Sequence, residues 1–250
     1  MEFERVLRQW GAGVSATPDA QAPYGLGSIR PNASHFSPCR CPYPIMMKII
    51  SWNLLRLTGA KLHDVLALID REQPDLLLMQ EATREIDGLP AAIGGHYARA
   101  PLPGRIHGVA MWTPRRLLTD PAVLPLPAGA VVRRVCQIID FGTFGVANVH
   151  LSHGQVLNRR QLRSIARALP HRAAVVGDYN LLGPALLPGF DDVGPRQPTH
   201  VMGDLVPLRI DRCLARGLIC SGARVLPPSV SDHRAIEVRL SIPEAIRLAA

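Results

Sequence analysis

The sequence has no apolar run of the about 18 residues that a membrane-spanning helix requires, so no transmembrane segment is predicted. Aromatic residues are also scarce, at 5% of 250 residues, which leaves few rings for stacking on unpaired bases. The hydrophobic fraction is 47% and the charged fraction 19%, and this balance excludes an intrinsically disordered chain. The length allows one large domain or two small ones.

Cysteine is sparse, and its spacing builds no recognisable metal site. The five cysteines contain no CxxC motif, and Cys39 and Cys41 lack the second pair that would complete a zinc site. The N-terminus has neither the positively charged start nor the apolar stretch of a secretory signal. We therefore expect free thiols and a cytoplasmic location.

Acidic residues are outnumbered, with 20 Asp and Glu against 28 Lys and Arg, for a net charge of +8. Residues 1–46 hold four arginines and three acidic residues, so +7 belongs to residues 47–250. A basic surface suits a polyanion: nucleic acid, an acidic membrane face or a phosphorylated small molecule. The alternative is an arginine-rich composition without functional meaning, so the charge alone selects no function.

The composition changes near residue 46. Residues 11–45 are rich in Gly, Pro, Ser, Ala and Asn and have neither a helical nor a strand period. Residues 1–46 are therefore predicted to be a flexible N-terminal extension, and one interpretation places the translation start at Met46 or Met47. Residues 47–241 are predicted to form a single α/β domain, followed by a short C-terminal tail over 242–250.

From residue 47 onward, predicted strands alternate with predicted helices. Apolar runs predict strands over 46–53, 76–79, 108–112, 131–139, 144–150 and 173–177. Apolar residues at helical spacing predict one amphipathic helix over 59–73 and another around 162–169. The proline-rich stretch 121–127 and the segment 182–198 are predicted to be loops. This alternation by itself favours a parallel sheet.

Polar residues accompany short apolar runs at six places. These are Ser51-Trp52-Asn53, Gln80-Glu81, Asn148-Val149-His150, Gly177-Asp178-Tyr179-Asn180, Arg209-Ile210-Asp211 and Ser231-Asp232-His233-Arg234. Each one alone is more often a turn residue or a structural histidine. Six repetitions of one arrangement predict a functional site, because the rigid sheets of α/β folds gather functional side chains at strand ends.

The ordered series SWN, QE, NVH, GDYN, RID and SDH resembles the endonuclease/exonuclease/phosphatase superfamily, whose members share the deoxyribonuclease-I-like fold. The resemblance covers residues 47 to 240, and its one mild departure is Tyr179, where the family usually has Phe or Leu. It implies an α/β, four-layer sandwich of two mainly antiparallel β-sheets flanked by helices, and so it replaces the parallel sheet that periodicity favours. Residues 47–241 would then be the catalytic domain.

The resemblance also implies a divalent-metal centre. Glu81 is the implied main carboxylate ligand, Asn53 supports the metal and the phosphate, and Asp232 is a second metal contact. Hard oxygen ligands of this kind favour Mg²⁺ or Mn²⁺. Such a metal neutralises phosphate oxygens and stabilises the charge of the transition state.

Five further residues take catalytic roles by resemblance. Asp178 orients or deprotonates the attacking water, and Asn180 hydrogen-bonds to the phosphate. Asp211 pairs with His233, which would raise the pKa of that histidine and keep it cationic against a phosphate oxygen. His150 contacts a phosphate oxygen or protonates the leaving group. Together these roles describe in-line hydrolysis of a phosphoester.

Other candidates carry weaker signals. His153 and Arg159 are candidate substrate-binding residues, although His153 also fits an ordinary loop residue. Arg159, Arg163 and Arg167 form one stripe of the second predicted helix, a pattern typical of a solvated face. His107-Gly108 opens a strand, where the glycine allows close packing or the approach of substrate. His200 is a candidate for the rim of the site.

The expected function is a divalent-metal-dependent phosphodiesterase, endonuclease-like and monomeric, that acts on nucleic acid or another anionic phosphodiester. A phosphatase or a phospholipid-headgroup phosphodiesterase is the alternative, because the chain is compact and poor in aromatic residues. A catalytically inactive phosphate-binding module is a third hypothesis. The metal and base positions argue against it, because all of them keep the family's residue type: Asn53, Glu81, Asp178, Asn180, Asp211, Asp232 and His233.

Overall fold

The computed structural model describes residues 46–129, 132–202 and 205–243. Except for Met46, the predicted N-terminal extension 1–46 lies outside the described residues, as does most of the predicted tail 242–250. The elements in chain order are β1 (Met46–Asn53), α2 (Leu62–Glu72), β2 (Leu76–Ala82), η1 (Arg84–Gly88), α3 (Leu89–Ile93), β3 (His96–Pro101), β4 (Gly108–Thr113), β5 (Ala122–Pro125), β6 (Val135–Asp140), β7 (Gly145–His150), α4 (Gln155–Ala168), β8 (Ala173–Asp178), β9 (Asp191–Asp192), β10 (His200–Met202), β11 (Val206–Leu208), β12 (Asp211–Arg216), β13 (Ile219–Val225) and β14 (Ile236–Ser241).

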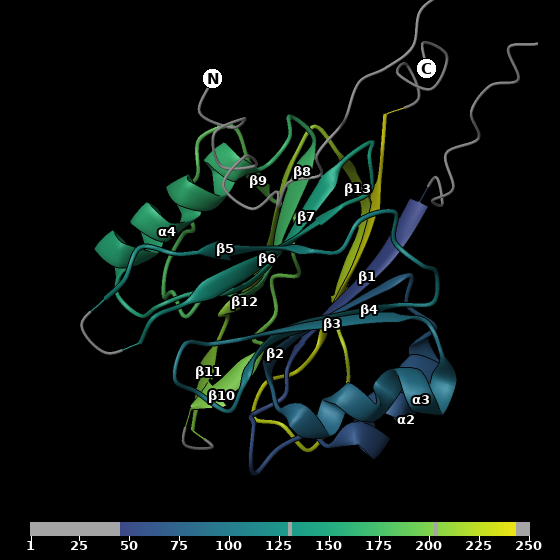
Figure 1. The fold of residues 1–250 in the computed structure, drawn as a ribbon. Helices are drawn as coiled ribbons and strands as arrows, with labels where there is room; N and C mark the ends of the chain where they lie inside the picture. The colour runs from purple at the N-terminus through teal and green to yellow at the C-terminus, as the bar shows by residue number, and fades with distance from the viewer. Residues whose placement is uncertain (1–45, 130–131, 203–204, 244–250) are drawn as a thin grey trace, which may run out of the picture. The chain divides into compact units, whose positions relative to one another are not determined.

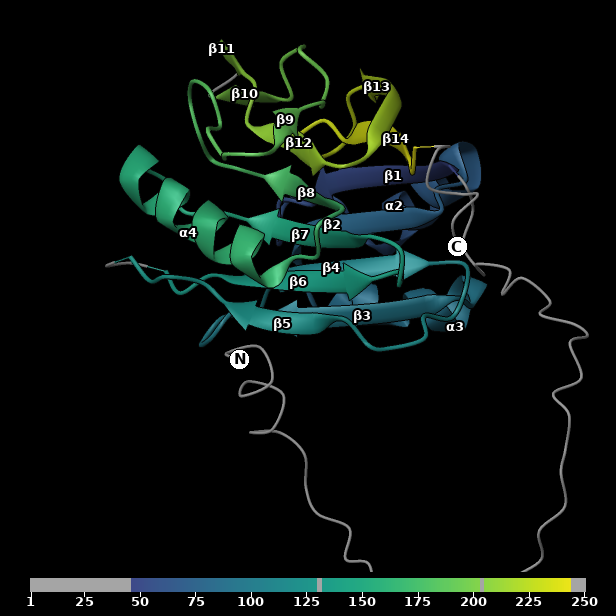
Figure 2. The same cartoon turned by 90° about the horizontal axis from the view of Figure 1, so that it is seen from above.

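The strands form two six-stranded sheets and one short hairpin. One sheet has the order β13-β14-β1-β2-β4-β3, the other has the order β5-β6-β7-β8-β12-β9, and β10 pairs with β11. Within each six-stranded sheet one pair is parallel, β1 with β2 and β7 with β8. The remaining described pairs are antiparallel, as the resemblance predicted. Figure 2 shows how the strands within each sheet lie next to one another.

The two parallel pairs explain why periodicity alone favours a parallel sheet. Parallel neighbours require a long crossover, and here each crossover is a helix: α2 joins β1 to β2, and α4 joins β7 to β8. These are the two helices that the apolar spacing predicts. Helical periodicity therefore detects the two βαβ units, but it does not predict the antiparallel strands that pair around them.

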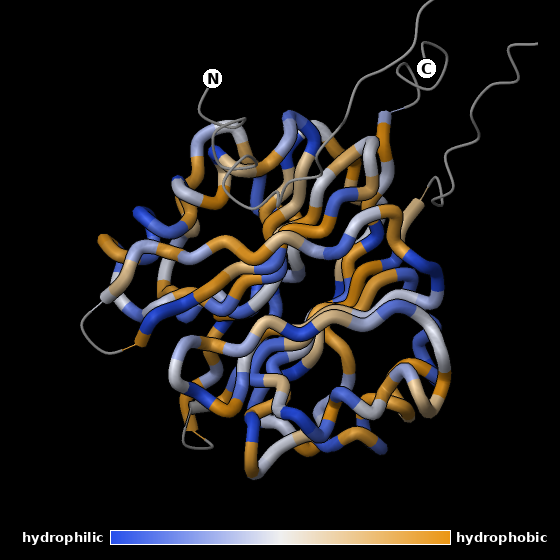
Figure 3. The backbone as a smooth tube through the Cα atoms, in the orientation of Figure 1, coloured by the Kyte–Doolittle hydropathy of each residue, from blue (hydrophilic) through white to orange (hydrophobic). Residues whose placement is uncertain are grey.

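Apolar packing builds four layers (Figure 1). One cluster joins the facing surfaces of the two sheets and includes Ile49 and Val176. A second fills the space between the β1-containing sheet and α2, and a third lies between the β7-containing sheet and α4. Figure 3 shows hydrophobic stretches along the central strands and also on the helices that cover them. The predicted four-layer sandwich is thus confirmed. None of the helices in the described residues is long and apolar enough to cross a membrane.

The prediction of a loop over 121–127 is wrong in part. Ala122–Pro125 forms β5, which pairs antiparallel with β6. Proline cannot donate a hydrogen bond to a sheet ladder, but β5 is an edge strand, where one side of the backbone needs no partner. The segment 182–198 is a loop as predicted, apart from the two-residue strand β9.

Candidate active site

The alternation of side chains along the strands places the polar residues between the two sheets. In β1, Ile49 belongs to the core between the sheets, so Ser51 and Asn53, two and four residues later, continue the same face. In β8, Val176 belongs to that core, and Asp178 follows it by the same spacing. Each apolar inner face therefore ends in polar side chains at one edge of the sandwich.

A layer of neutral polar side chains separates the apolar core from this edge. Nε2 of Gln80 donates to Oδ1 of Asn148 at 2.9 Å and to Oγ of Ser51 at 3.1 Å. Nδ2 of Asn148 donates to the carbonyl oxygen of Ala110 at 2.8 Å and lies 3.2 Å from Oε1 of Gln137. All four amide and hydroxyl side chains are buried. Such a satisfied network fixes the relative position of strands from both sheets.

Asp178 is the buried centre of the site, with 1% of its surface exposed. Its Oδ2 accepts a hydrogen bond from Nδ2 of Asn53 at 3.0 Å and lies 3.3 Å from Nε2 of His150. Burial and the charge of Asp211 raise the pKa of Asp178 to about 7, although His233 and the hydrogen bonds to the carboxylate oppose the shift. A carboxylate with a pKa near neutrality can accept a proton from water.

Gly177 allows the strand that carries Asp178 to approach β7. Its φ is +145°, and an added Cβ would lie 2.0 Å from the carbonyl oxygen of Val149. No side chain fits there, because the obstructing atom belongs to the backbone of the neighbouring strand. The glycine of the GDYN motif thus allows Asp178 to lie beside His150, with which it is paired in the β7–β8 register.

Asp211 and His233 form a buried pair beside Asp178. Nδ1 of His233 lies 2.9 Å from Oδ2 of Asp211, and its Nε2 lies 3.9 Å from Oδ2 of Asp178. Burial disfavours the charged imidazole, but the charge and hydrogen bond of Asp211, together with the charges of Asp178 and Asp232, raise the pKa of His233 to about 9. His233 is therefore cationic at neutral pH.

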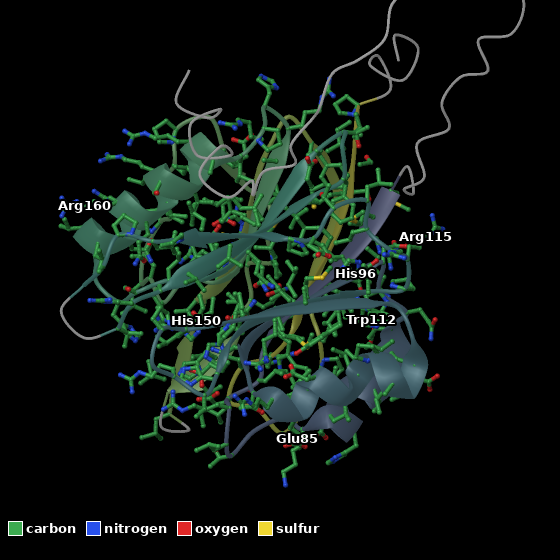
Figure 4. The ribbon with its side chains drawn as sticks, in the orientation of Figure 1. Glu85, His96, Trp112, Arg115, His150 and Arg160 are labelled. Atoms are coloured by element: carbon green, nitrogen blue, oxygen red, sulfur yellow. The ribbon has the colours of Figure 1, made fainter. Side chains whose placement is uncertain are left out.

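His150 and Asn180 hold Asp178 in place. His150 is buried inside the molecule (Figure 4), and burial together with the nearby Arg134 lowers its pKa well below the ordinary value, so the ring is neutral. Asn180 adopts a left-handed φ of 48°. Its backbone N–H donates to Oδ1 of Asp178 at 2.8 Å, and its side-chain Nδ2 lies within reach of Oδ2 of Asp178 and the carbonyl of Leu151.

Glu81 lies at a break in the strand pattern, and its charge acts on Arg134, as the charge of Asp178 does. The inner face of β2 carries Leu76, Leu78 and Gln80, so regular alternation would turn Glu81 toward the helical layer. Instead the β2–β4 register shifts between Met79 and Ala82, and Glu81 has a φ of 55°. A bulge of this kind redirects one side chain, and left-handed backbone in a non-glycine residue is typical of functional positions.

Carboxylate oxygens near Asp178 are candidate ligands for a divalent cation. Oε2 of Glu81 is buried without a hydrogen-bond partner in the described residues, and so is Oδ1 of Asp211. Unpaired buried carboxylate oxygens are costly unless a cation or substrate completes them. Two groups of side chains have ligand atoms within 4.8 Å of one another: Asp178, Asp211 and His233 form one, and His200, Asp232 and His233 form the other.

The structure brings six of the predicted site residues together: Asn53, His150, Asp178, Asn180, Asp211 and His233. Asp232 lies at the edge of this group, where its Oδ2 is 3.7 Å from Nδ1 of His200. His153 is exposed in the loop after β7. Arg159 is half-buried on α4 and makes no described contact with the group. Figure 4 shows Arg160, its neighbour, pointing away from His150.

Two further residues lie near Asp178: Arg134, which the sequence did not single out, and His107, which it offered only as a weaker candidate. Arg134 is 9% exposed, and the charges of Asp178 and Glu81 act on its guanidinium. His107 is 8% exposed and lies near Arg134. Both precede a strand: Arg134 comes directly before β6, and His107 directly before β4. Because these strands run antiparallel to β7 and β2, their amino ends lie at the edge of the sandwich that carries His150 and Asp178.

A two-sheet α/β sandwich with carboxylates and histidines gathered at one edge is the architecture of the deoxyribonuclease-I-like proteins. The model of the Endonuclease/Exonuclease/phosphatase family matches residues 50–233, which is most of the chain. The chain therefore belongs to this family, and membership supports a phosphoric ester hydrolase. No curated protein matches the chain by sequence.

Solved structures share the fold. An endonuclease/exonuclease/phosphatase from Beutenbergia cavernae DSM 12333 aligns with a TM-score of 0.60 and 16% identity, over 80% of this chain and 72% of that chain. The human Nocturnin catalytic domain with bound sulfate aligns with a TM-score of 0.61 and 18% identity, over 79% of this chain and 94% of that chain. A D. rerio TDP2 humanized by 14 mutations aligns with a TM-score of 0.61 and 16% identity, over 79% of this chain and 100% of that chain. At these identities the likeness shows a common fold.

Proposed function

We propose that the protein is a divalent-metal-dependent phosphodiesterase that hydrolyses a phosphoester by in-line attack of water. The observation that carries this proposal is the arrangement of Asp178 between Asn53, His150 and the Asp211–His233 pair. It sets a carboxylate of near-neutral pKa beside a buried cation. A proton acceptor next to a fixed positive charge suits an attack that releases a proton while negative charge builds on a phosphate.

Each residue then has a defined task. Asp178 accepts the proton of the attacking water, while Asn53, Asn180 and His150 fix its orientation. His233, held cationic by Asp211, donates a hydrogen bond from Nε2 to a phosphate oxygen. His150, being neutral, positions the carboxylate, which favours this role over the protonation of the leaving group.

Glu81 is the proposed main ligand of Mg²⁺ or Mn²⁺, and Asn53 and Asp232 are proposed to assist it. Support comes from the unpartnered buried Oε2 of Glu81 and from the oxygen-rich donor set. When bound, such a cation supplies positive charge that neutralises phosphate oxygens. The cytoplasmic location and the monomeric state predicted from the sequence remain predictions.

A chromogenic diester tests the proposal directly. The protein should release 4-nitrophenolate from bis(4-nitrophenyl) phosphate with Mg²⁺ or Mn²⁺, and EDTA should abolish the release. Asp178→Ala and His233→Ala should each remove activity without unfolding the protein, as checked by circular dichroism. Activity that persists in EDTA or in both variants would show that the site is wrongly assigned.

The substrate within this reaction class is proposed to be nucleic acid or another anionic phosphodiester. A phospholipid headgroup is the second candidate, because the β10–β11 hairpin beside His200 exposes three apolar side chains, Val201, Leu205 and Val206. A panel of plasmid DNA, single-stranded DNA, RNA, phosphatidylinositol phosphates, sphingomyelin and nucleotides separates the two. Preference for a lipid would contradict the nuclease hypothesis, whereas DNA cleavage that weakens as salt rises would support it.

A further inference from the structure

A basic pocket opens next to Glu81, beside the catalytic group rather than within it. It has a volume of about 440 Å³, in the range of small-molecule sites. Its ionisable lining residues are Arg56, Glu81, Arg105, His107 and Arg134. Of the proposed metal ligands Asn53, Glu81 and Asp232, only Glu81 lines this pocket. Asp178, Asn53 and His233 do not line it.

The charges of this pocket are unbalanced. Three guanidinium groups converge on it, and one carboxylate, that of Glu81, faces them. Nη1 of Arg56 lies 3.5 Å from Oε2 of Glu81, but the Arg56 side chain is half-exposed and the contact is long. Burial and the three surrounding arginines lower the pKa of His107 to about 4, so the imidazole is neutral and can still donate one hydrogen bond.

Arg134 supplies an independent sign that a ligand belongs here. Its side chain is more than nine-tenths buried, yet its Nε has no hydrogen-bond partner in the described residues. A buried N–H without a hydrogen-bond partner is costly, and burial lowers the pKa of Arg134 despite the charges of Asp178 and Glu81. The planar fork of arginine matches phosphate oxygens in geometry and charge.

We propose that this pocket binds a second phosphoryl group of the substrate, next to the phosphoester that is cleaved. The inference rests on the proposed function and adds to it the substrate class: a molecule with two neighbouring phosphoryl groups rather than an isolated diester. The cleaved group lies over Asp178 and His233, and the second group lies beyond Glu81 among Arg56, Arg105 and Arg134. The neighbouring phosphate of a nucleotide chain and a terminal phosphomonoester share this chemistry.

Two matched substrates test the pocket. The 4-nitrophenyl ester of thymidine 5′-phosphate carries one phosphoryl group, and the same ester with an added 3′-phosphate carries two. In the wild type, the second group should raise kcat/KM for 4-nitrophenolate release by about tenfold or more, the effect of one or two charge-assisted hydrogen bonds. A third ester, with the 3′-phosphate capped by methyl, separates a diester neighbour from a terminal monoester.

Variants of the pocket should remove this advantage. Arg105→Ala changes an exposed residue and should not affect folding, while Arg134→Ala and Arg134→Lys change the buried one. Each should bring the ratio of the two kcat/KM values toward one. Arg167→Ala is the matched control, because Arg167 is exposed near the end of α4, at the opposite end of the sheet from Asp178, and should keep the wild-type ratio.

Binding without catalysis gives a separate measurement. In EDTA, thymidine 3′,5′-bisphosphate should bind the wild type at least about tenfold more tightly than thymidine 5′-phosphate by calorimetry, and Arg105→Ala should reduce the difference. Failure to cleave either ester with Mg²⁺ or Mn²⁺ would contradict the proposed function. Cleavage of both at equal efficiency, or a ratio unchanged in all pocket variants, would overturn the pocket assignment alone.

Discussion

His233 lies between two buried aspartates: its Nδ1 is 2.9 Å from Oδ2 of Asp211, and its Nε2 is 3.9 Å from Oδ2 of Asp178. The ring therefore connects the carboxylate that keeps it charged with the carboxylate proposed to activate water. The two carboxylates differ in what they can do, because Asp211 is hydrogen-bonded to the histidine while Asp178 is hydrogen-bonded to the neutral amides of Asn53 and Asn180.

Asp211→Asn should reduce kcat on the order of 100-fold, because the amide keeps the shape of the pair but removes the charge that holds His233 cationic. The measurement is diester hydrolysis with Mn²⁺ at constant pH, with the melting temperature as a check on folding. Asp120→Asn is the control, since Asp120 lies 3.3 Å from His96 in a second aspartate–histidine pair outside the site. Equal losses in both variants would contradict the assigned role of Asp211.

Asp178→Asn should abolish activity and raise stability together. The folded protein raises the pKa of Asp178 from 3.8 to about 7, so ionising this carboxylate opposes folding. The wild type should lose stability as pH rises through this window, and the full penalty should apply above about pH 7. In EDTA, the melting temperature of the variant should therefore be a few degrees above that of the wild type at pH 8, and the difference should nearly vanish near pH 4. A few degrees is the change in melting temperature that about 1 kcal/mol produces in a domain of this size.

The exposed residue Asp70 of α2 provides the control for that prediction. Asp70→Asn should leave both the activity and the pH dependence of the melting temperature unchanged. An Asp178→Asn protein that melts below the wild type at pH 8 would contradict a raised pKa at this position.

Gly177→Ala should destabilise the protein severely, by about 3 kcal/mol or more, or prevent folding, because the added Cβ meets the Val149 carbonyl in a backbone conformation that alanine rarely adopts. Urea unfolding measures the change. Gly222→Ala in β13 is the matched control, since an added Cβ there has no atom within 4 Å and should be tolerated. Comparable stability of the two variants would be incompatible with the close approach of β7 and β8.

Glu81→Gln should weaken Mn²⁺ binding by about tenfold or more, because a neutral amide replaces the carboxylate whose buried Oε2 has no hydrogen-bond partner in the described residues. Calorimetric titration with Mn²⁺ measures the effect apart from catalysis. Glu85→Gln, in the exposed turn that follows, is the control and should bind as the wild type does. A larger loss in Asp232→Asn than in Glu81→Gln would instead place the main ligand on the His200 side.

The sequence predicted the catalytic edge where two local rules coincide. Strand alternation and the position of polar residues at the carboxyl ends of β1, β7 and β8 select Asn53, His150 and Asp178 without knowledge of the sheet order. The family resemblance then supplied the pairing of Asp211 with His233. Both residues come from segments that periodicity could not place in space.

Non-local pairing decided the rest. Arg134 and His107 stand at the amino ends of their strands, and they reach the catalytic edge because those strands run antiparallel to their neighbours. A pattern search limited to carboxyl ends passes over Arg134, and His107 drew notice only because it opens a strand with Gly108. Glu81 is the opposite case: the motif names it, but alternation would point it away, and a bulge absent from any local pattern turns it inward.

The site takes Asn53 from one sheet and Asp178 from the other, joined by a hydrogen bond of 3.0 Å. Turnover is therefore a sensitive reporter of how the sheets dock. Consider a state in which each sheet keeps its hydrogen bonds between strands but the core between the sheets expands. This state would retain its far-UV circular dichroism and show no activity. Activity should thus be lost at a lower denaturant concentration than secondary structure.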